Sequence, residues 1–208
     1  MDASQKGAEL QGVAFQKHLK KKNIKQMRKM DAMALCDGNV GFGGFWPCVD
    51  GYVICDDQYR LYERGEYNDV PVIVMTNSDE GALFTPGNIK AADYQNAAKR
   101  MFGDMAEEAM KVYPGRTDDE AWHANGDAFR DMGFAWPSYA WVSLQAKTGN
   151  PNGKGLPYWP TFDAGKPTTM QFSNGATLIT VPNRQQIEFV DRFFKAKREA
   201  TEKARRER

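Results

Sequence analysis

The sequence predicts an α/β chain that is rich in helices and contains few strands. A short apolar run over residues 70–74 is typical of a strand that is buried on both faces, as in a parallel sheet. Most of the remaining length instead shows apolar residues at helical spacing, often beside capping signals. With 208 residues, the chain is long enough for one domain with a sizeable core.

The predicted strand covers residues 70–76 and ends in a polar segment. Pro71 lies near its start, where a missing backbone donor is harmless. Asn77-Ser-Asp-Glu-Gly81 follows and carries Glu80 to the carboxyl end of the strand. Open α/β sheets place their chemistry at that edge, so Glu80 is the first candidate for a functional residue.

Two helices are predicted before this strand, over residues 7–21 and 24–35. The first carries apolar residues at helical spacing, with lysines around its other side. Methionines in the second are predicted to fill gaps in the core. These apolar positions are Leu10, Val13, Ala14 and Leu19 in the first helix, and Ile24, Met27, Met30, Ala34 and Leu35 in the second. The glycine-rich residues 37–44 are interpreted as a connecting loop.

Longer helices are predicted after the strand. Residues 91–113 form one that is broken near Gly103. Thr117 and Glu120 form a capping box that opens another, which continues to about Gln145 with Pro137 as a kink or boundary. A loop rich in Gly, Asn and Pro is expected over residues 148–160.

The C-terminal third is predicted to contain a hairpin and a last helix. Residues 168–181 alternate in polarity around a turn at Ser173-Asn-Gly175. Residues 185–197 form an amphipathic helix that places Ile187, Val190, Phe193 and Phe194 inward. The charged tail 196–208 is expected to fray into solvent as a disordered segment.

Composition gives no support to several classes of function. The formal net charge of +1 gives no argument for binding nucleic acid or an anionic membrane. No apolar run reaches the length of a membrane span, and the N-terminus lacks the apolar stretch of a secretory signal. The cellular compartment is therefore left open, including export of a parent enzyme.

The three cysteines do not form a metal-binding pattern. Cys36, Cys48 and Cys55 have no histidine nearby and do not match zinc-site spacings. We interpret them as small buried apolar residues, with a Cys48–Cys55 or Cys36–Cys48 disulfide as the alternative. No metal and no cofactor are predicted.

Three segments, in this order, carry a family resemblance: FWPCVDGY (45–52), MTNSDEGALFT (75–85) and AKTGNPNGKGLPYW (146–159). Together they resemble the C-terminal portion of the type B carboxylesterases, the cholinesterase-like branch of the α/β-hydrolases. The resemblance implies that residues 1–208 form part of an α/β-hydrolase domain. It also implies hydrolysis of carboxylic esters by a serine esterase, with Glu80 as the acid of a Ser-Glu-His triad.

The other two triad members have no counterpart in these 208 residues. No GxSxG motif occurs, and the family's histidine segment would fall where Gln145 runs directly into Ala146. His18 and His123 are the only histidines, and neither stands in the family's HG motif. The chain as given is therefore expected to be inactive alone, with Glu80 vestigial and not hydrogen-bonded to histidine.

Other interpretations remain open. The chain could be a non-catalytic interaction remnant, or one half of a split esterase that pairs with an N-terminal half or with itself. It could also be a helical module unrelated to esterases. Without catalysis, Glu80 is expected to be exposed or to cap a helix beginning near residues 81–83.

Overall fold

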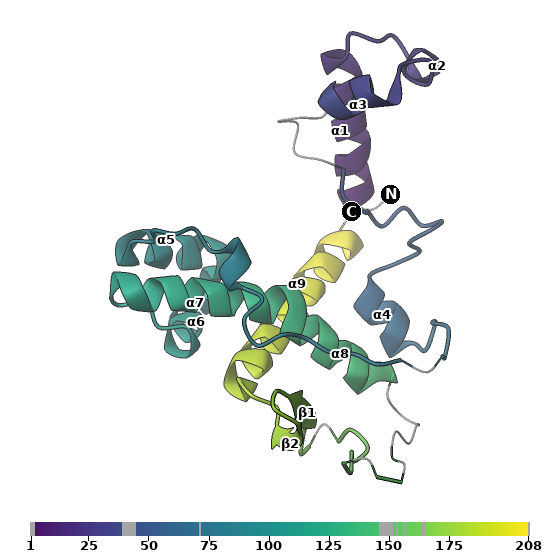
Figure 1. Ribbon diagram of the computed structural model, residues 1–208. Helices are drawn as coiled ribbons and strands as arrows, with labels where there is room; N and C mark the ends of the chain where they lie inside the picture. Colours follow the sequence, from purple (N-terminus) through teal and green to yellow (C-terminus); the bar gives the residue numbers. More distant parts are fainter. Residues whose placement is uncertain are drawn as a thin grey trace. The chain divides into compact units, whose positions relative to one another are not determined.

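A computed structural model describes residues 3–38, 45–70, 72–145, 152, 154–155, 157–163 and 165–207. The chain divides into two compact units, Met1–Tyr67 and Asn68–Arg208 (Figure 1). Most of the predicted connector at 37–44 lies outside the described residues, as do Pro71 and much of the predicted loop at 148–160.

The first unit contains four helices among its described residues. They are α1 (Ala3–His18), α2 (Ile24–Met27), α3 (Ala32–Gly38) and α4 (Gln58–Glu63). Phe15 is its buried anchor, and its ring packs edge-on against Phe45 with the centroids 5.1 Å apart. The chain leaves α1 through Lys20, which has a positive φ of 53° and lets the Lys21 N–H reach the Gln16 carbonyl.

Three predictions for the helices of this unit are wrong. Leu10 and Val13 were expected on a buried stripe, but they are 62% and 47% exposed, because α1 turns Phe15 inward instead. The single helix predicted over 24–35 is divided into α2 and α3. The Asp31 carboxylate accepts the backbone N–H groups of Met33 and Ala34, which starts a new helix there. Neither Met27 nor Met30 is buried.

The second unit is a helical assembly with one hairpin in its described part. Its elements are η1 (Ala82–Phe84), α5 (Ala91–Phe102), η2 (Gly103–Met105), α6 (Ala106–Val112), α7 (Asp118–Arg130), η3 (Asp131–Ala135), α8 (Trp136–Gln145), β1 (Thr168–Phe172), β2 (Ala176–Thr180) and α9 (Arg184–Arg206). The predicted break at Gly103 is confirmed, with φ 55°. The Thr117 cap is also confirmed, since its hydroxyl accepts the Glu120 N–H at 3.2 Å.

Aromatic rings from α5 and α9 form the core of this unit. Phe102 packs edge-on against Phe189 and Phe193, at centroid distances of 5.4 and 5.2 Å. Phe189 and Val190 are fully buried, and Ile187 is almost fully buried. The inward face predicted for the last helix is thus confirmed at Ile187, Val190 and Phe193, while Phe194 is only half-buried.

The predicted hairpin is confirmed, and the C-terminal tail is helical rather than irregular up to Arg206. β1 and β2 pair antiparallel, with Phe172 opposite Ala176 around the Ser173–Gly175 turn. Residues 196–206 continue α9 as a helix with mostly exposed side chains. Alanine, lysine, arginine and glutamate are strong helix formers, so this segment extends a helix that is already anchored by packing.

The strand predicted over residues 70–76 is wrong in the described part of the chain. Residues 72–76 are irregular and pair with no other segment described by the structure. Ile73 and Met75 are 79% and 76% exposed. A strand forms only where a neighbour pairs with its backbone, and the described residues supply no such neighbour.

The fold is therefore helix-rich with a two-stranded sheet among the described residues, which is compatible with a fragment of an α/β fold. The parallel sheet implied by residues 70–74 is not present there. Among those residues, no helix combines the length and the apolar character that crossing a bilayer requires.

Candidate functional site

Glu80 lies in a turn that follows the extended segment. Its carboxylate accepts hydrogen bonds from the Thr76 hydroxyl and the Asn77 side-chain amide, both at 2.9 Å. The residue is half-buried. It does not cap η1, which has no side-chain cap, so the capping role expected for Glu80 is wrong. Two local donors hold the carboxylate instead.

A close backbone approach fixes the Glu80 turn against α7. A Cβ atom on Gly81 would lie 1.8 Å from the carbonyl oxygen of Gly126, so only glycine fits here. The Thr85 hydroxyl donates to the Gly81 carbonyl at 2.9 Å. Arg130, at the end of α7, donates to the Ser78 carbonyl at 3.2 Å. The turn is thus anchored on both sides of Glu80.

Neither histidine completes a catalytic pair with this carboxylate. His123 lies exposed on α7, with its ring edge-on to Trp122 at 4.9 Å. Within the described residues, the side-chain hydrogen bonds to Glu80 come from Thr76 and Asn77, and none comes from His123. His18 belongs to α1 of the first unit and stacks near Phe15. The described residues contain no histidine bonded to the candidate acid.

A second carboxylate, which the sequence did not single out, is fully buried nearby in the same unit. Asp131 begins η3, a π-helical turn, and is 0% exposed. It accepts hydrogen bonds from Tyr113 Oη at 3.0 Å, from Arg130 Nε at 2.9 Å and from the Asn183 side chain. Burial raises the pKa of Asp131, and donation from Arg130 and Tyr113 opposes that shift.

Arg130 connects the two carboxylate regions. The same guanidinium binds Asp131, Asp127 at 2.7 Å and the Ser78 carbonyl of the Glu80 turn. Its side chain is only 16% exposed. The position of the Glu80 turn therefore depends on the buried Asp131 network as well as on the Gly81–Gly126 contact. A polar residue pair, Arg-Asp, inside a helical apolar pattern was the one sequence signal for this network.

Two tyrosines extend the network into the core. Tyr94 Oη donates to the Tyr113 carbonyl at 2.8 Å, and Tyr113 Oη donates to Asp131. Burial raises the pKa of Tyr94 to about 12. Burial and the Asp131 carboxylate also raise the pKa of Tyr113. Both hydroxyls are therefore proton donors in the folded state.

These shifts predict a loss of stability in alkaline solution. An unfolded tyrosine ionises near pH 10, whereas folded Tyr94 ionises at about 12. As the pH rises above 10, the unfolded state releases the proton first, so the free energy of unfolding falls. Thermal melts between pH 8 and 12 are expected to shift downward for the wild type and less for Tyr94→Phe. Tyr158→Phe, at a 71% exposed position, is the control and should follow the wild type. Equal alkaline slopes for all three proteins would contradict the prediction.

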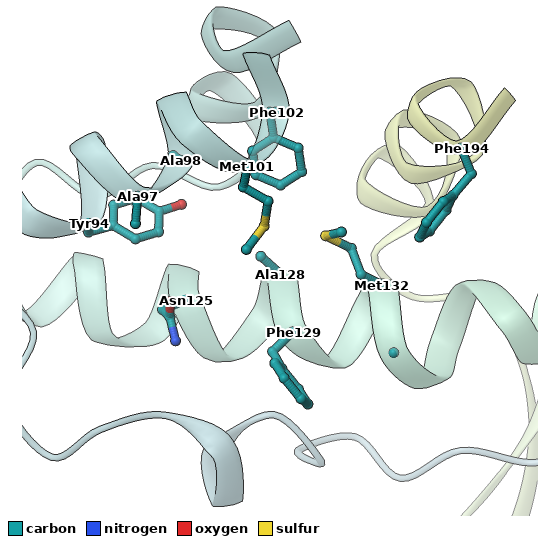
Figure 2. A pocket seen from close by; sticks show the side chains of 11 residues that line it. Tyr94, Ala97, Ala98, Met101, Phe102, Asn125, Ala128, Phe129, Met132 and Phe194 are labelled. Carbon is teal, nitrogen blue, oxygen red and sulfur yellow. The ribbon is translucent and has the colours of Figure 1, made fainter. Parts of the chain in front are cut away.

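An apolar cavity of about 290 Å³ lies between α5, α7 and α9 (Figure 2). Met101 from α5 and Met132 from η3 point into it, and Phe194 closes the side toward α9. Asn125 supplies an amide at its wall and reaches Thr85 at 3.5 Å. Apart from that amide and the Tyr94 hydroxyl, which is already bonded, the lining is apolar.

The cysteines and the acidic residues form no metal site in the described chain. Its residues contain no cluster of three or more His, Cys, Asp or Glu side chains able to hold a metal ion. Cys36 and Cys55 are exposed thiols and Cys48 is half-buried, all three unpaired. Their interpretation as buried apolar residues is therefore wrong, and neither alternative disulfide is formed.

Comparison with known proteins finds distant, partial similarity to esterases and lipases. No family model matches the chain. The chain is 31% identical to fumonisin B1 esterase of Sphingopyxis macrogoltabida over 90 residues, a match that covers 42% of this chain and 17% of that protein. It is 33% identical to lipase 1 of Geotrichum candidum over 87 residues, which are 38% of this chain and 16% of the lipase. It is 34% identical to lipase 2 of the same organism over 80 residues, which are 35% of this chain and 14% of that lipase.

The chain thus spans about a sixth of the length of the curated relatives it matches. The similarity supports an esterase- or lipase-like ancestry at most. Among the described residues, the Glu80 carboxylate is bonded by Thr76 and Asn77 and not by an imidazole.

Proposed function

We propose that residues 1–208 are the C-terminal portion of a type B serine carboxylesterase, and that Glu80 is the acid of its triad. The observation that carries the proposal is the fixed placement of Glu80. Gly81 is locked against Gly126, and Arg130 holds the Ser78 carbonyl, so the carboxylate between them is positioned. An acid that orients a histidine needs such a rigid support. The partial similarity to esterases and lipases supports the same reaction class.

The 208-residue chain alone is proposed to be inactive. Ester hydrolysis by a triad needs a nucleophile and a base within hydrogen-bond reach of each other. The printed sequence contains no GxSxG motif, and the Glu80 carboxylate is satisfied by Thr76 and Asn77 rather than by an imidazole. In this chain Glu80 therefore only stabilises the turn that contains it.

The first test is hydrolysis of p-nitrophenyl acetate by the purified chain. We expect a rate equal to that of Glu80→Gln and of buffer containing an inert protein, with no labelling by a serine-directed phosphonate. Turnover that Glu80→Gln and the phosphonate both abolish would overturn the inactivity. Asp79→Asn is the matched control, since it removes a neighbouring exposed carboxylate that is not among the hydrogen-bond partners of Glu80.

A second candidate is one half of a split esterase, and the exposed extended segment favours it. Val72, Ile73 and Met75 present apolar side chains and an unpaired backbone in the described structure, as a strand awaiting a neighbour would. The partner would be a polypeptide that carries both GxSxG and the HG histidine.

Complementation tests this candidate and the role of Glu80 together. The chain is mixed with an esterase segment that supplies the serine and the histidine, and ester hydrolysis is followed. Activity should appear, and Glu80→Gln should lower it by as much as about 10⁴-fold, the scale at which a triad acid acts. Equal recovered activity with Asp79→Asn and with Glu80→Gln would remove Glu80 from the mechanism.

A further inference from the structure

The first unit contains an uninterrupted run of positive charge. Between Glu9 and Asp31 no Asp or Glu occurs, and seven Lys or Arg residues do. We call residues 10–30 the basic segment; its cations are Lys17, Lys20, Lys21, Lys22, Lys25, Arg28 and Lys29. Because the whole chain has a net charge of only +1, the remaining residues are net acidic, and the overall charge conceals this local surface.

None of these seven cations is neutralised within the described structure. Six are exposed and Lys21 is half-buried. The ion pairs of the described residues use other cations, namely Arg64, Lys90, Arg130, Arg184 and Arg192. The dipole at the C-terminus of α1 favours a cation or two in its last turn, but it does not account for Lys25, Arg28 and Lys29 around α2.

The turn at the centre of the segment also retains lysine at a conformational cost. Lys20 has φ 53°, in the left-handed region where glycine or asparagine is usual. Lys20 is followed by two more lysines, so three cations are grouped between α1 and α2.

Apolar side chains are exposed beside the charges. Leu10, Val13 and Lys17 lie on one side of α1, because they are three and four residues apart. Leu10 is 62% exposed and Val13 is 47% exposed. Ile24, at the start of α2, is 60% exposed. A surface that combines lysines with exposed aliphatic side chains can attract an anionic bilayer by charge and bury apolar area in its interface.

From this combination we propose that the basic segment binds the surface of an anionic phospholipid bilayer, with the cations on the headgroups and Leu10, Val13 and Ile24 in the interface. A single-stranded nucleic acid is the other large polyanion to consider. Its binding sites stack bases on exposed aromatic rings. Phe15 is the only Phe, Tyr or Trp in the segment, and it is 6% exposed and packed on Phe45. The exposed aliphatic side chains favour the lipid surface.

Co-sedimentation with vesicles tests the proposal. The 208-residue chain is expected to bind vesicles of phosphatidylcholine mixed with phosphatidylglycerol, to bind phosphatidylcholine alone much more weakly, and to dissociate at high salt. The triple variant Lys20→Gln, Lys21→Gln, Lys22→Gln should lower the partition coefficient on mixed vesicles on the order of 100-fold, at about fivefold per charge.

A matched variant separates the local surface from net charge. Lys99→Gln, Lys111→Gln, Lys166→Gln removes the same charge from exposed positions of the second unit and should bind within about twofold of the wild type. Leu10→Asn with Ile24→Asn should weaken binding at least about tenfold, because apolar burial is lost. Circular dichroism checks that each variant keeps the wild-type helix content.

Two results would overturn the proposal. One is equal binding of the wild type and the Lys20–Lys22 variant to mixed vesicles. The other is binding of a single-stranded oligothymidylate through the same lysines without binding to the vesicles.

Discussion

Replacing Asp131 by alanine is expected to lower the free energy of unfolding by about 3–5 kcal/mol. The carboxylate is 0% exposed and accepts hydrogen bonds from Tyr113, Arg130 and Asn183. Its removal leaves a nearly buried guanidinium with one carboxylate partner fewer and two neutral donors unsatisfied. Urea denaturation followed by circular dichroism measures the loss.

Asp127→Ala is the matched control for this change. Asp127 also pairs with Arg130, at 2.7 Å, but its side chain is 46% exposed. A pair of this kind contributes at most about 1 kcal/mol. Comparable losses for the two variants would show that burial of the Asp131 network adds nothing to stability.

Gly81→Ala is expected to lower the free energy of unfolding by about 3 kcal/mol and to displace the Glu80 turn. The added Cβ would meet the Gly126 carbonyl oxygen at 1.8 Å, and that atom belongs to the backbone of α7 rather than to a flexible side chain. Relief of the clash requires the turn to move away from the helix, which also strains the Thr85 hydrogen bond to Gly81.

Gly87→Ala tests whether the effect is local. A Cβ at Gly87 meets no atom within 4 Å, and its backbone does not need a positive φ. This variant should be as stable as the wild type or slightly more stable, because alanine restricts the unfolded chain. In a complementation assay, Gly81→Ala should also lower recovered activity while Gly87→Ala should not. Wild-type stability of Gly81→Ala would contradict the close packing of the turn.

Local signals in the sequence predicted the helices of the second unit well. The cap at Thr117 depends on its own hydroxyl and the Glu120 N–H three residues on, and the break at Gly103 depends on the positive φ that glycine allows. The Ser173–Gly175 turn likewise specifies its own hairpin. These features need no knowledge of the rest of the fold.

Features that depend on distant partners were not predictable in the same way. The apolar run at residues 72–75 has strand composition, yet it forms no strand in the described structure, because a strand requires a second backbone. The burial of Phe15 rather than Leu10 depends on where Phe45 lies. The Asp131 network joins Tyr113, which follows α6, to Asp131 in η3 and to Asn183, which precedes α9, and these residues are far apart along the chain.

At the candidate site, the sequence identified Glu80 and the absence of a matching histidine motif. It did not reveal what holds the acid. Gly81 is informative only once Gly126 is known to lie against it, and Arg130 only once its reach to Ser78 is seen. The catalytic role of Glu80 itself stays a prediction until complementation is measured.

The π-helical turn η3 determines how mutation by insertion or deletion would act on this unit. Ala121, Ala124 and Ala128 of α7 and Asp131 of η3 are buried at spacings of three or four residues, and beyond them both Ala135 and Trp136 are buried, four and five residues after Asp131. The wider π-helical turn keeps Asp131 and Trp136 on the core side although five residues separate them. Loss of one residue from 132–135 would therefore be more than a shortening: it would rotate α8 by about 100° relative to α7. The indole of Trp136 would then leave Asp191, its partner on α9. Insertions and deletions should accordingly be tolerated in the loops of this unit, but not within the continuous helix formed by α7, η3 and α8.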